Sequence, residues 1–411
     1  MRITAIEVIS LYEPSDGAAR DWWSTTPLDL LYADGTHRLD QRQPGAESAG
    51  TITNVIVKVN TDEGTHGVGN VGVGAAAAMA VIEHHLAPLL IGESPFDVER
   101  LWQKMYRHTV SFGRKGLVIE AISALDIALW DIIGKATGQP VYNLLGGRTR
   151  ESIRAYASQS YAREDLDQLA EESRSYVEQG FGALKMRFGY GPRDGRAGMR
   201  RNRELVATVR EAIGPDVDLM AEAYMGWDVN YAIAMIKLIE EYDLAWVEEP
   251  VLPDDLASYR RIRQAVGVPI SGGEHEFTLK GFHALLKAEA VDVLQPDVNR
   301  MGGITEARKV WALAEAYEVP VVPHSNQAHN AHLIMASLAS PFMEYFPEGG
   351  LRTGYNFYTE FFTGEPTARD GRVHLDDRPG LGIDLNPETI ERYRADARTI
   401  GGDGAVAAGA Q

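Results

Sequence analysis

Six short stretches decide the fold: DVDLMAE (216–222), LAWVEE (244–249), VPISGGE (268–274), VDVLQPD (291–297), VPVVPH (319–324) and SPFME (340–344). Each is a mostly apolar run that ends on an acidic residue or a histidine. Along the chain these are Glu222, Glu248, Glu274, Asp297, His324 and Glu344, spaced by 26, 26, 23, 27 and 20 residues. Such a period accommodates one strand, one crossover helix and two loops of a parallel α/β fold. If the strands close into a barrel, the six side chains meet at the rim where barrel active sites are built.

The rest of the chain divides around this repeat. Residues 1 to about 60 have the alternating and β-branched patterns of strands, interrupted by an irregular stretch from residue 13 to 50 that is typical of a lid or a disordered segment. Residues 75–138 are helical in pattern, with an apolar stripe that Gly138 and Pro140 end. Barrel strands are predicted at 152–157, 183–187, 217–222, 244–248, 268–273, 291–295, 319–323 and 342–346. The turn-rich segment 366–411 is expected to pack back on the first domain and to end in a disordered tail.

Composition and charge exclude several functional classes. The chain has 411 residues, 45% of them hydrophobic, and a net charge of −18. This charge argues against an electrostatic grip on nucleic acid or on an anionic membrane. The sequence contains no cysteine and no apolar run as long as a membrane span, which suits a reducing cytoplasm. A negatively charged substrate must therefore be attracted locally, by a metal ion or by a few basic side chains.

The three equally spaced glutamates suggest a metal site. Glu222, Glu248 and Glu274 each stand at the terminus of a predicted strand and offer hard oxygen ligands. Carboxylates without cysteine or histidine favour Mg²⁺ over zinc. A single glutamate at such a place more often caps the following helix or pairs with a surface arginine. For three at the same spacing we favour the metal site, with one Mg²⁺ per subunit.

Asp297 and His324 end consecutive predicted strands. An aspartate beside a histidine orients the ring and raises its basicity, which is the arrangement of a general base. The alternative is that both residues belong to simple turns. Glu344 is predicted to hydrogen-bond a developing enolate oxygen if it is protonated, or a substrate hydroxyl, or else to cap a helix.

Lys185 and Arg187 lie two residues apart on the strand 183–187, so both point to the same face. At the barrel mouth they would neutralise a substrate carboxylate near the metal. In the predicted reaction His324 removes the proton α to that carboxylate, and the metal with the two cations stabilises the enediolate. Without such stabilisation, an imidazole is too weak a base for this proton.

These residues resemble the enolase superfamily, in its mandelate racemase-like branch. The resemblance covers nearly the whole chain and rests on the helix ALDIALWDIIGKATGQPVYNLLGG (124–147), the Lys-x-Arg strand, the three carboxylates, the Asp297–His324 pair and PGLG (379–382). Within that branch, SGGEHEFTLKGF (271–282) and VVPHS (321–325) are similar to acid-sugar dehydratases of the L-rhamnonate type. The resemblance implies an α/β fold with a modified (β/α)7β TIM-type barrel (131–365), an N-terminal α+β capping domain (1–130) and a C-terminal segment (366–411) that completes the cap.

The resemblance also implies residue roles. Glu222, Glu248 and Glu274 would bind Mg²⁺, His324 would abstract the C2 proton with Asp297 as its partner, and Glu344 would stabilise the transition state. Loss of the C3 hydroxyl would give a 2-keto-3-deoxy sugar acid. Lys185, Arg187, Glu344 and, from the capping loop, Trp22 and Arg42 would contact the substrate. The family usually has aspartate at the position of Glu222, and the rhamnonate-type enzymes do not carry arginine at the position of Arg187.

Two other functions share these residues. A racemase or epimerase, or a cycloisomerase, would use the same enediolate but would need a second base opposite His324. Lys185 could reach, whereas Arg187 is effectively never deprotonated. A non-catalytic protein with the same fold would not be expected to keep the complete set of ligands and the histidine pair. A homo-oligomer, from dimer to octamer, is the assembly that the resemblance implies, and the absence of cysteine favours a cytoplasmic location.

Overall fold

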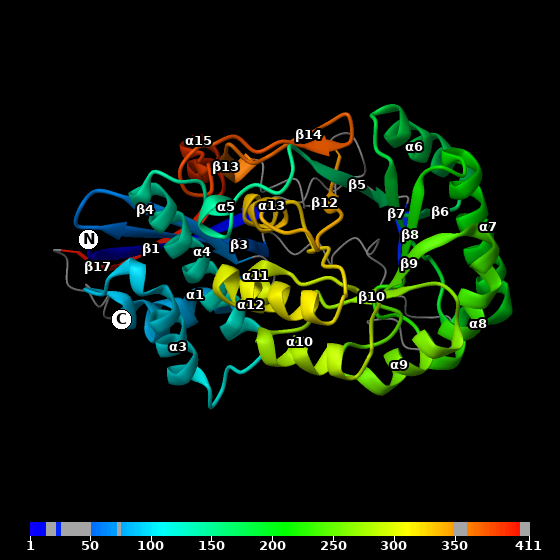
Figure 1. Cartoon of the computed structure of the whole chain (residues 1–411), viewed down its shortest axis with the longest axis horizontal. Helices are drawn as coiled ribbons and strands as arrows, with labels where there is room; N and C mark the ends of the chain where they lie inside the picture. Colours follow the sequence, from blue (N-terminus) through cyan, green and yellow to red (C-terminus); the bar gives the residue numbers. More distant parts are fainter. Residues whose placement is uncertain (14–21, 26–50, 72–74, 348–359, 403–411) are drawn as a thin grey trace.

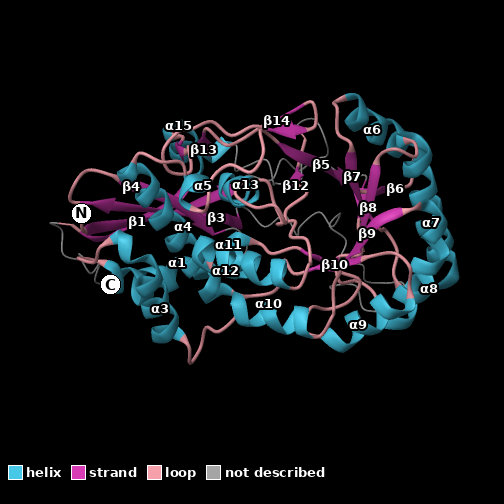
Figure 2. Cartoon of the chain, viewed as in Figure 1, coloured by secondary structure: helices cyan, strands magenta, loops and turns pink. Residues whose placement is uncertain are grey.

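The computed structural model describes residues 1–13, 22–25, 51–71, 75–347 and 360–402. Its two parts lie side by side, with an antiparallel sheet and its helices at one end and a barrel at the other (Figure 1). Figure 2 shows that helices line the outside of the barrel strands. The predicted capping-loop residue Arg42 lies outside the described residues, and so does the tail after residue 402. For Trp22 the structure describes the backbone, which pairs in a short ladder with Arg163.

The antiparallel sheet has the order β17-β1-β3-β4. Its strands are β1 (Ile3–Glu13), β3 (Thr51–Thr61), β4 (His66–Val71) and β17 (Arg394–Gly401). β17 pairs with β1 along Ala5–Leu11, so the end of the chain completes the sheet begun by its start. This pairing explains why the sequence after residue 366 returns to the first domain.

Helices cover this sheet. They are α1 (Ala75–Val81), η1 (Ile82–Leu86), α2 (Ala87–Leu90), η2 (Pro95–Asp97), α3 (Val98–Thr109), α4 (Leu117–Thr137) and α5 (Val141–Leu144). α4 ends where the sequence predicts, because Gly138 adopts a left-handed conformation (φ 65°) as its cap. A side-chain carbon at Gly67 of β4 would lie 2.0 Å from the backbone oxygen of Ala128, so glycine is what allows α4 to approach the sheet. The predicted domain boundary between residues 130 and 131 falls inside α4 and stays a prediction.

The barrel strands are parallel neighbours in the order β11-β10-β9-β8-β7-β5, and β12 pairs with β5 on the other side. They are β5 (Ile153–Ser160), β7 (Ala183–Arg187), β8 (Asp218–Glu222), β9 (Leu244–Glu248), β10 (Ile270–Gly272), β11 (Val293–Leu294) and β12 (Met343–Tyr345). The helices between them are α6 (Leu166–Glu178), α7 (Gly195–Ile213), α8 (Val229–Ile239), α9 (Leu256–Ala265), α10 (Thr278–Lys287), α11 (Val298–Met301), α12 (Gly303–Ala316) and α13 (Ala328–Met335). The expected α/β barrel is confirmed.

Two neighbouring predicted strands are wrong in extent: the strand predicted at 291–295 is shortened to Val293–Leu294, and the next one is shorter still. Residues 319–323 do not form a regular strand, and the segment is reduced to a single bridge between Val321 and Leu294. Pro320 and Pro323 flank that bridge and have no N–H to donate to a ladder. The parallel pairing still continues through the backbone, since Val322 N donates to Leu294 O at 2.8 Å and His324 N donates to Pro296 O at 3.0 Å. His324 is therefore placed at the rim as a strand would place it.

Several short elements complete the described chain. They are β2 (Trp22–Trp23), β6 (Ala162–Arg163), η3 (Pro192–Asp194), η4 (Glu240–Tyr242), β13 (Phe362–Thr363), β14 (Ala368–Arg369), β15 (Arg372–Val373), β16 (Asp384–Leu385) and α15 (Pro387–Tyr393). β15 pairs antiparallel with β5, so the C-terminal segment touches the barrel before it reaches the cap. Asp131 of α4 accepts hydrogen bonds from Leu381 N and from Val68 N at 2.9 and 3.1 Å. Within the residues that the structure describes, no helix is both long enough and apolar enough to span a membrane.

Candidate active site

The three predicted metal ligands lie together at the carboxyl ends of neighbouring strands. Glu222 ends β8, Glu248 ends β9, and Glu274 follows β10 by two residues. One carboxylate oxygen of each lies within 4.8 Å of the others, and all three side chains are buried. Parallel pairing sets this geometry, because Glu222 and Glu248 are register partners in adjacent strands.

The cluster fits a hard divalent cation. Every donor atom is a carboxylate oxygen, which Mg²⁺ prefers. Oε2 of Glu222 is buried and makes no well-directed hydrogen bond among the described residues, although it lies 3.2 Å from both Lys185 Nζ and Arg187 Nε. Burying several carboxylates so close together is costly unless positive charge compensates them. The pKa of Glu248 shows this cost, because burial and the neighbouring carboxylates raise it to about 7 even though Lys185 acts against them.

Lys185 lies among the carboxylates. Its Nζ lies 3.2 Å from Glu222 Oε2 and 3.1 Å from Glu344 Oε1, and it also donates to Glu248 Oε1. The side chain is 1% exposed. Burial alone would lower the pKa of Lys185, but the three carboxylates outweigh it and raise that pKa well above its ordinary value. The prediction that Lys185 and Arg187 share one face is confirmed, and that face is the interior of the site.

Arg187 lies beside Lys185 and is hydrogen-bonded to Ser158 of β5. Its Nη1 donates to Ser158 O and its Nη2 to Ser158 Oγ, both at 3.0 Å. Its guanidinium lies 4.5 Å from the centre of the Tyr161 ring. Ser158 Oγ in turn donates to Glu344 Oε1 at 2.6 Å. Arg187 is thus held in place by β5 and contacts Glu222 at the edge of the cluster.

His324 and Asp297 form the predicted pair. Nδ1 of His324 lies 2.8 Å from Asp297 Oδ2. Nε2 points toward the cluster and lies 3.7 Å from Glu274 Oε2 and 4.0 Å from Glu344 Oε2. Burial alone lowers the pKa of His324, but Glu274, Asp297 and Glu344 outweigh it and raise it to about 9. The arrangement leaves one ring nitrogen facing the place where a ligand on the carboxylates would lie.

Glu344 is the middle residue of β12 and is fully buried. Its Oε2 accepts a hydrogen bond from the backbone N–H of Ser325 at 2.7 Å. Burial raises the pKa of Glu344, but Lys185, His324, Arg187 and the Ser158 hydroxyl outweigh this and lower it to about 2. Glu344 is therefore ionised here, and it acts as an acceptor.

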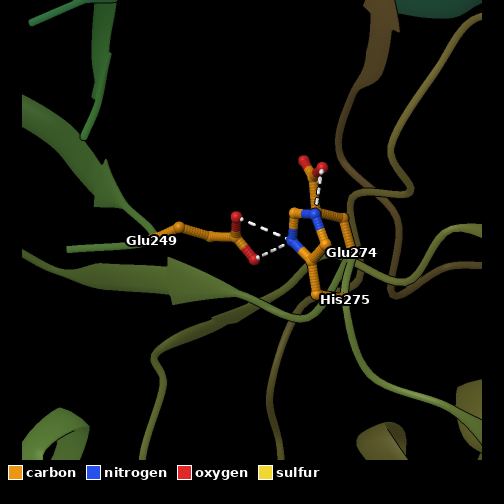
Figure 3. A group of neighbouring side chains, drawn as sticks. All are labelled: Glu249, Glu274 and His275. Carbon is orange, nitrogen blue, oxygen red and sulfur yellow. Dashed lines mark hydrogen bonds and ion pairs between the residues drawn. The ribbon is translucent and has the colours of Figure 1, made fainter. Parts of the chain in front are cut away.

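A second group borders the three glutamates. Figure 3 shows the ring of His275 between Glu249 and Glu274. Nδ1 of His275 lies 2.9 and 3.0 Å from the two carboxylate oxygens of Glu249, and Nε2 lies 3.6 Å from Glu274 Oε1. Neither Glu249 nor His275 is among the site residues that the sequence predicts. Their positions directly after Glu248 and Glu274 are the signal that could have found them.

The sequence also does not predict other polar contacts that Glu248 and Glu274 make. Trp246 Nε1 and Gln295 Nε2 donate to Glu248 Oε2 at 3.0 and 2.7 Å. Arg300 Nη1 lies 3.1 Å from Glu274 Oε1. Burial raises the pKa of Glu274, but the charges of His324, His275 and Arg300 outweigh burial and lower it. Trp246 shares β9 with Glu248, whereas Gln295 and Arg300 come from other segments that only the folded barrel brings to the ligands.

Comparisons with known proteins find relatives over most of the chain. Residues 36–146 match the family model of the mandelate racemase / muconate lactonizing enzyme N-terminal domain, and residues 168–389 match the enolase C-terminal domain-like model. The chain is 38% identical over 355 residues to L-rhamnonate dehydratase of Saccharopolyspora erythraea, covering 86% of this chain and 87% of that protein.

Solved structures extend the similarity. Rhamnonate dehydratase from Gibberella zeae, complexed with Mg, has a TM-score of 0.81 and 31% identity, covering 95% of this chain and 96% of that one. The 3,6-anhydro-D-galactonate cycloisomerase from Zobellia galactanivorans has a TM-score of 0.81 and 32% identity, covering 96% of this chain and 100% of that one.

Proposed function

Because the chain belongs to the mandelate racemase and muconate lactonizing enzyme family of the enolase superfamily, we propose that it is a Mg²⁺-dependent acid-sugar dehydratase. It removes the C2 proton and the C3 hydroxyl of an aldonate of the L-rhamnonate kind and yields a 2-keto-3-deoxy sugar acid. The observation that carries the proposal is the direction of His324, whose Nε2 faces the buried carboxylate cluster while Nδ1 is held by Asp297.

Glu222, Glu248 and Glu274 would hold the Mg²⁺. When bound, the ion supplies positive charge that stabilises negative charge developing on the substrate carboxylate. Support comes from the all-carboxylate donor set and from the Mg that the Gibberella zeae enzyme carries. The buried carboxylates lie close together, so a bound cation would offset their negative charge.

His324 acts as the base at C2. Asp297 fixes the ring through Nδ1, so the proton arrives at Nε2, and Asp297 stabilises the imidazolium that forms. The same imidazolium returns its proton to the departing C3 hydroxyl, provided that both bonds lie on one face of the substrate. Water leaves, and the resulting enol becomes the 2-keto product.

The remaining charged side chains bind the reacting end of the substrate. Glu344, held ionised by Lys185 and by the backbone of Ser325, accepts a hydrogen bond from a substrate hydroxyl. Lys185 and Arg187 contribute positive charge close to the carboxylate being activated. Trp22 and Arg42 are proposed as contacts from the capping loop, which is where selection among sugar acids would be made.

A cycloisomerase is the second candidate, since one structural relative is of that kind. That reaction, like racemisation, needs a second group to deliver a proton opposite His324. Lys185 Nζ is enclosed by carboxylates that favour its charged form, and Arg187 is effectively always protonated, so neither gives up a proton readily. Dehydration, which a single base and its conjugate acid can complete, therefore fits the site better.

A substrate screen tests the proposal. A library of aldonic and aldaric acids is incubated with Mg²⁺, with and without EDTA, and 2-keto acid formation is measured together with C2 proton exchange in D₂O. Keto product that disappears with EDTA supports dehydration. Inversion at C2 without keto product would replace it by racemisation, and the absence of exchange with every acid would remove the enediolate reaction altogether.

We also propose a cellular location and an oligomeric state for the enzyme. A cytoplasmic location is supported by the absence of cysteine, and a homo-oligomer is expected from the family. Light scattering coupled to gel filtration measures the assembly. Nucleic acid and membrane surfaces are not proposed as partners, because the net charge of −18 opposes both.

A further inference from the structure

Arg300 contacts both a proposed metal ligand, Glu274, and the partner of the proposed base, Asp297. Its Nη1 lies 3.1 Å from Glu274 Oε1 and 3.3 Å from the backbone oxygen of the same residue. Its Nε lies 3.2 Å from Asp297 Oδ2. Since this Asp297 oxygen also binds His324, one guanidinium joins a proposed metal ligand to the proposed base pair.

These contacts close into a ring. From His324 Nδ1 the path runs to Asp297, through Arg300 to Glu274, and back to His324 Nε2, which lies 3.7 Å from Glu274 Oε2. Arg300 occupies Oε1 of Glu274 and so leaves Oε2 as the oxygen that faces the histidine. The distance between ligand and base is therefore set by side chains that contact one another directly.

We propose that Arg300 is a positioning residue that holds Glu274 in register with the Asp297–His324 pair; this inference rests on the proposed function. A guanidinium presents its N–H donors in a rigid planar fork and can bind two carboxylates at fixed spacing. An ammonium group is a point charge on a flexible stem and cannot impose that spacing. Arg300 thus contributes geometry in addition to positive charge.

The segment that carries Arg300 is fixed from the capping side. Asp297 caps the four-residue helix α11, accepting hydrogen bonds from Asn299 N and Arg300 N at 2.8 and 3.2 Å. At its other end, Gly302 N donates to Ser123 Oγ of α4 and Gly302 O accepts from Trp102 Nε1 of α3, both at 2.8 Å. The helices of the cap therefore hold the backbone from which the guanidinium reaches Glu274.

Three variants test the role. Arg300→Met removes both contacts, Arg300→Lys keeps the charge, and Arg308→Met is the control, because Arg308 on the neighbouring α12 forms a half-exposed ion pair with Glu99 at 3.0 Å. The rate is measured at saturating Mg²⁺, established separately for each variant. We expect Arg300→Met to lower kcat roughly 10- to 100-fold, as for other partners of metal ligands, with KM changed much less. Arg300→Lys should recover only part of that loss, and Arg308→Met should stay within about twofold of the wild type.

A second measurement needs neither substrate nor metal. The His324 Nδ1–H proton, bound to Asp297, gives a low-field proton NMR signal that is assigned by its absence in His324→Asn. In metal-free protein we expect Arg300→Met to shift or remove this signal, and Arg308→Met to keep it. If the wild type turned over no sugar acid, the proposed function would fail, and the NMR comparison would still decide the role of Arg300.

Two results would overturn the inference. One is an Arg300→Met protein with the wild-type signal and kcat. The other is an Arg300→Lys protein that matches the wild type in both, since charge alone would then suffice. The lysine variant keeps the test decisive if Arg300→Met does not fold.

Discussion

Nε2 of His324 lies 3.7 Å from Oε2 of Glu274, although the two residues are 50 positions apart in the chain. The separation places a proton acceptor next to a proposed metal ligand, at the same rim of the barrel. A substrate atom held at the carboxylate cluster therefore lies within reach of the imidazole. This short distance brings the proposed metal ligands and the proposed base together in one candidate site.

Replacing the proposed base should stop the reaction and leave the fold intact. His324→Asn retains a polar side chain of similar size beside Asp297 but cannot accept the C2 proton. We expect kcat to fall roughly 10²- to 10⁴-fold, the usual contribution of a general base. Calorimetry should show unchanged Mg²⁺ binding, and His283→Asn, on the exposed face of α10, is the matched control. Full turnover by His324→Asn would assign the base to another residue.

Neutralising one glutamate should act mainly on the metal. Glu248 is 1% exposed and accepts hydrogen bonds from Trp246 and Gln295, so Glu248→Gln can keep its place in the barrel. Losing a charged ligand should weaken Mg²⁺ affinity by about tenfold or more, which is about 1.4 kcal/mol in the free energy of binding. Isothermal calorimetry measures it, with the exposed Glu241→Gln as the control. Equal affinity in both variants would speak against Glu248 as a ligand.

Lys185 should contribute most to the stability of the fold when no metal is bound. Its Nζ contacts Glu222, Glu248 and Glu344 inside the barrel, and Lys185→Met leaves these buried carboxylates without that charge. Removing one partner of a buried ion pair costs about 3–5 kcal/mol of the free energy of unfolding. Urea unfolding in EDTA should show this loss, and Mg²⁺ should restore more stability to the variant than to the wild type. A variant as stable as the wild type in EDTA would contradict the role given to Lys185.

A buried carboxylate away from the site should make stability depend on pH. Burial raises the pKa of Asp126 to about 7, against hydrogen bonds from Thr305, one of them from its backbone N–H at 2.9 Å. The native state therefore keeps a proton that the unfolded chain loses near its ordinary value of 3.8. This contribution is complete below that value and is lost as pH rises through about 7, at about 1.4 kcal/mol per pH unit in between.

Asp126→Asn should remove that dependence. The difference in free energy of unfolding between wild type and variant, measured by urea at pH 5, 6 and 7, should move in favour of the variant as pH rises. Taking the difference cancels the groups that titrate in both proteins. A constant difference across this range would show that Asp126 is already ionised at pH 5.

The sequence alone determined the repeat and the chemistry at its ends. Strand and helix patterns follow local hydrophobic periodicity, so β7, β8 and β9 begin and end within a residue of their predicted ranges. The interval of 20 to 27 residues then placed six side chains at one rim: Glu222, Glu248, Glu274, Asp297, His324 and Glu344. Parallel strands that close into a ring leave such side chains no other place to meet.

Only the tertiary structure decided what surrounds those side chains. Lys185 was expected to face the substrate, and the fold shows that it also neutralises carboxylates from three other strands. Arg300 reaches Glu274, and His275 reaches Glu249, through contacts between separate segments, which no local pattern encodes. Residues 319–323 have the composition of a strand, yet their prolines leave a single bridge. Long-range contacts and the balance of buried charge depend on the closed barrel, and these decide how the rim residues are oriented and which protons they hold.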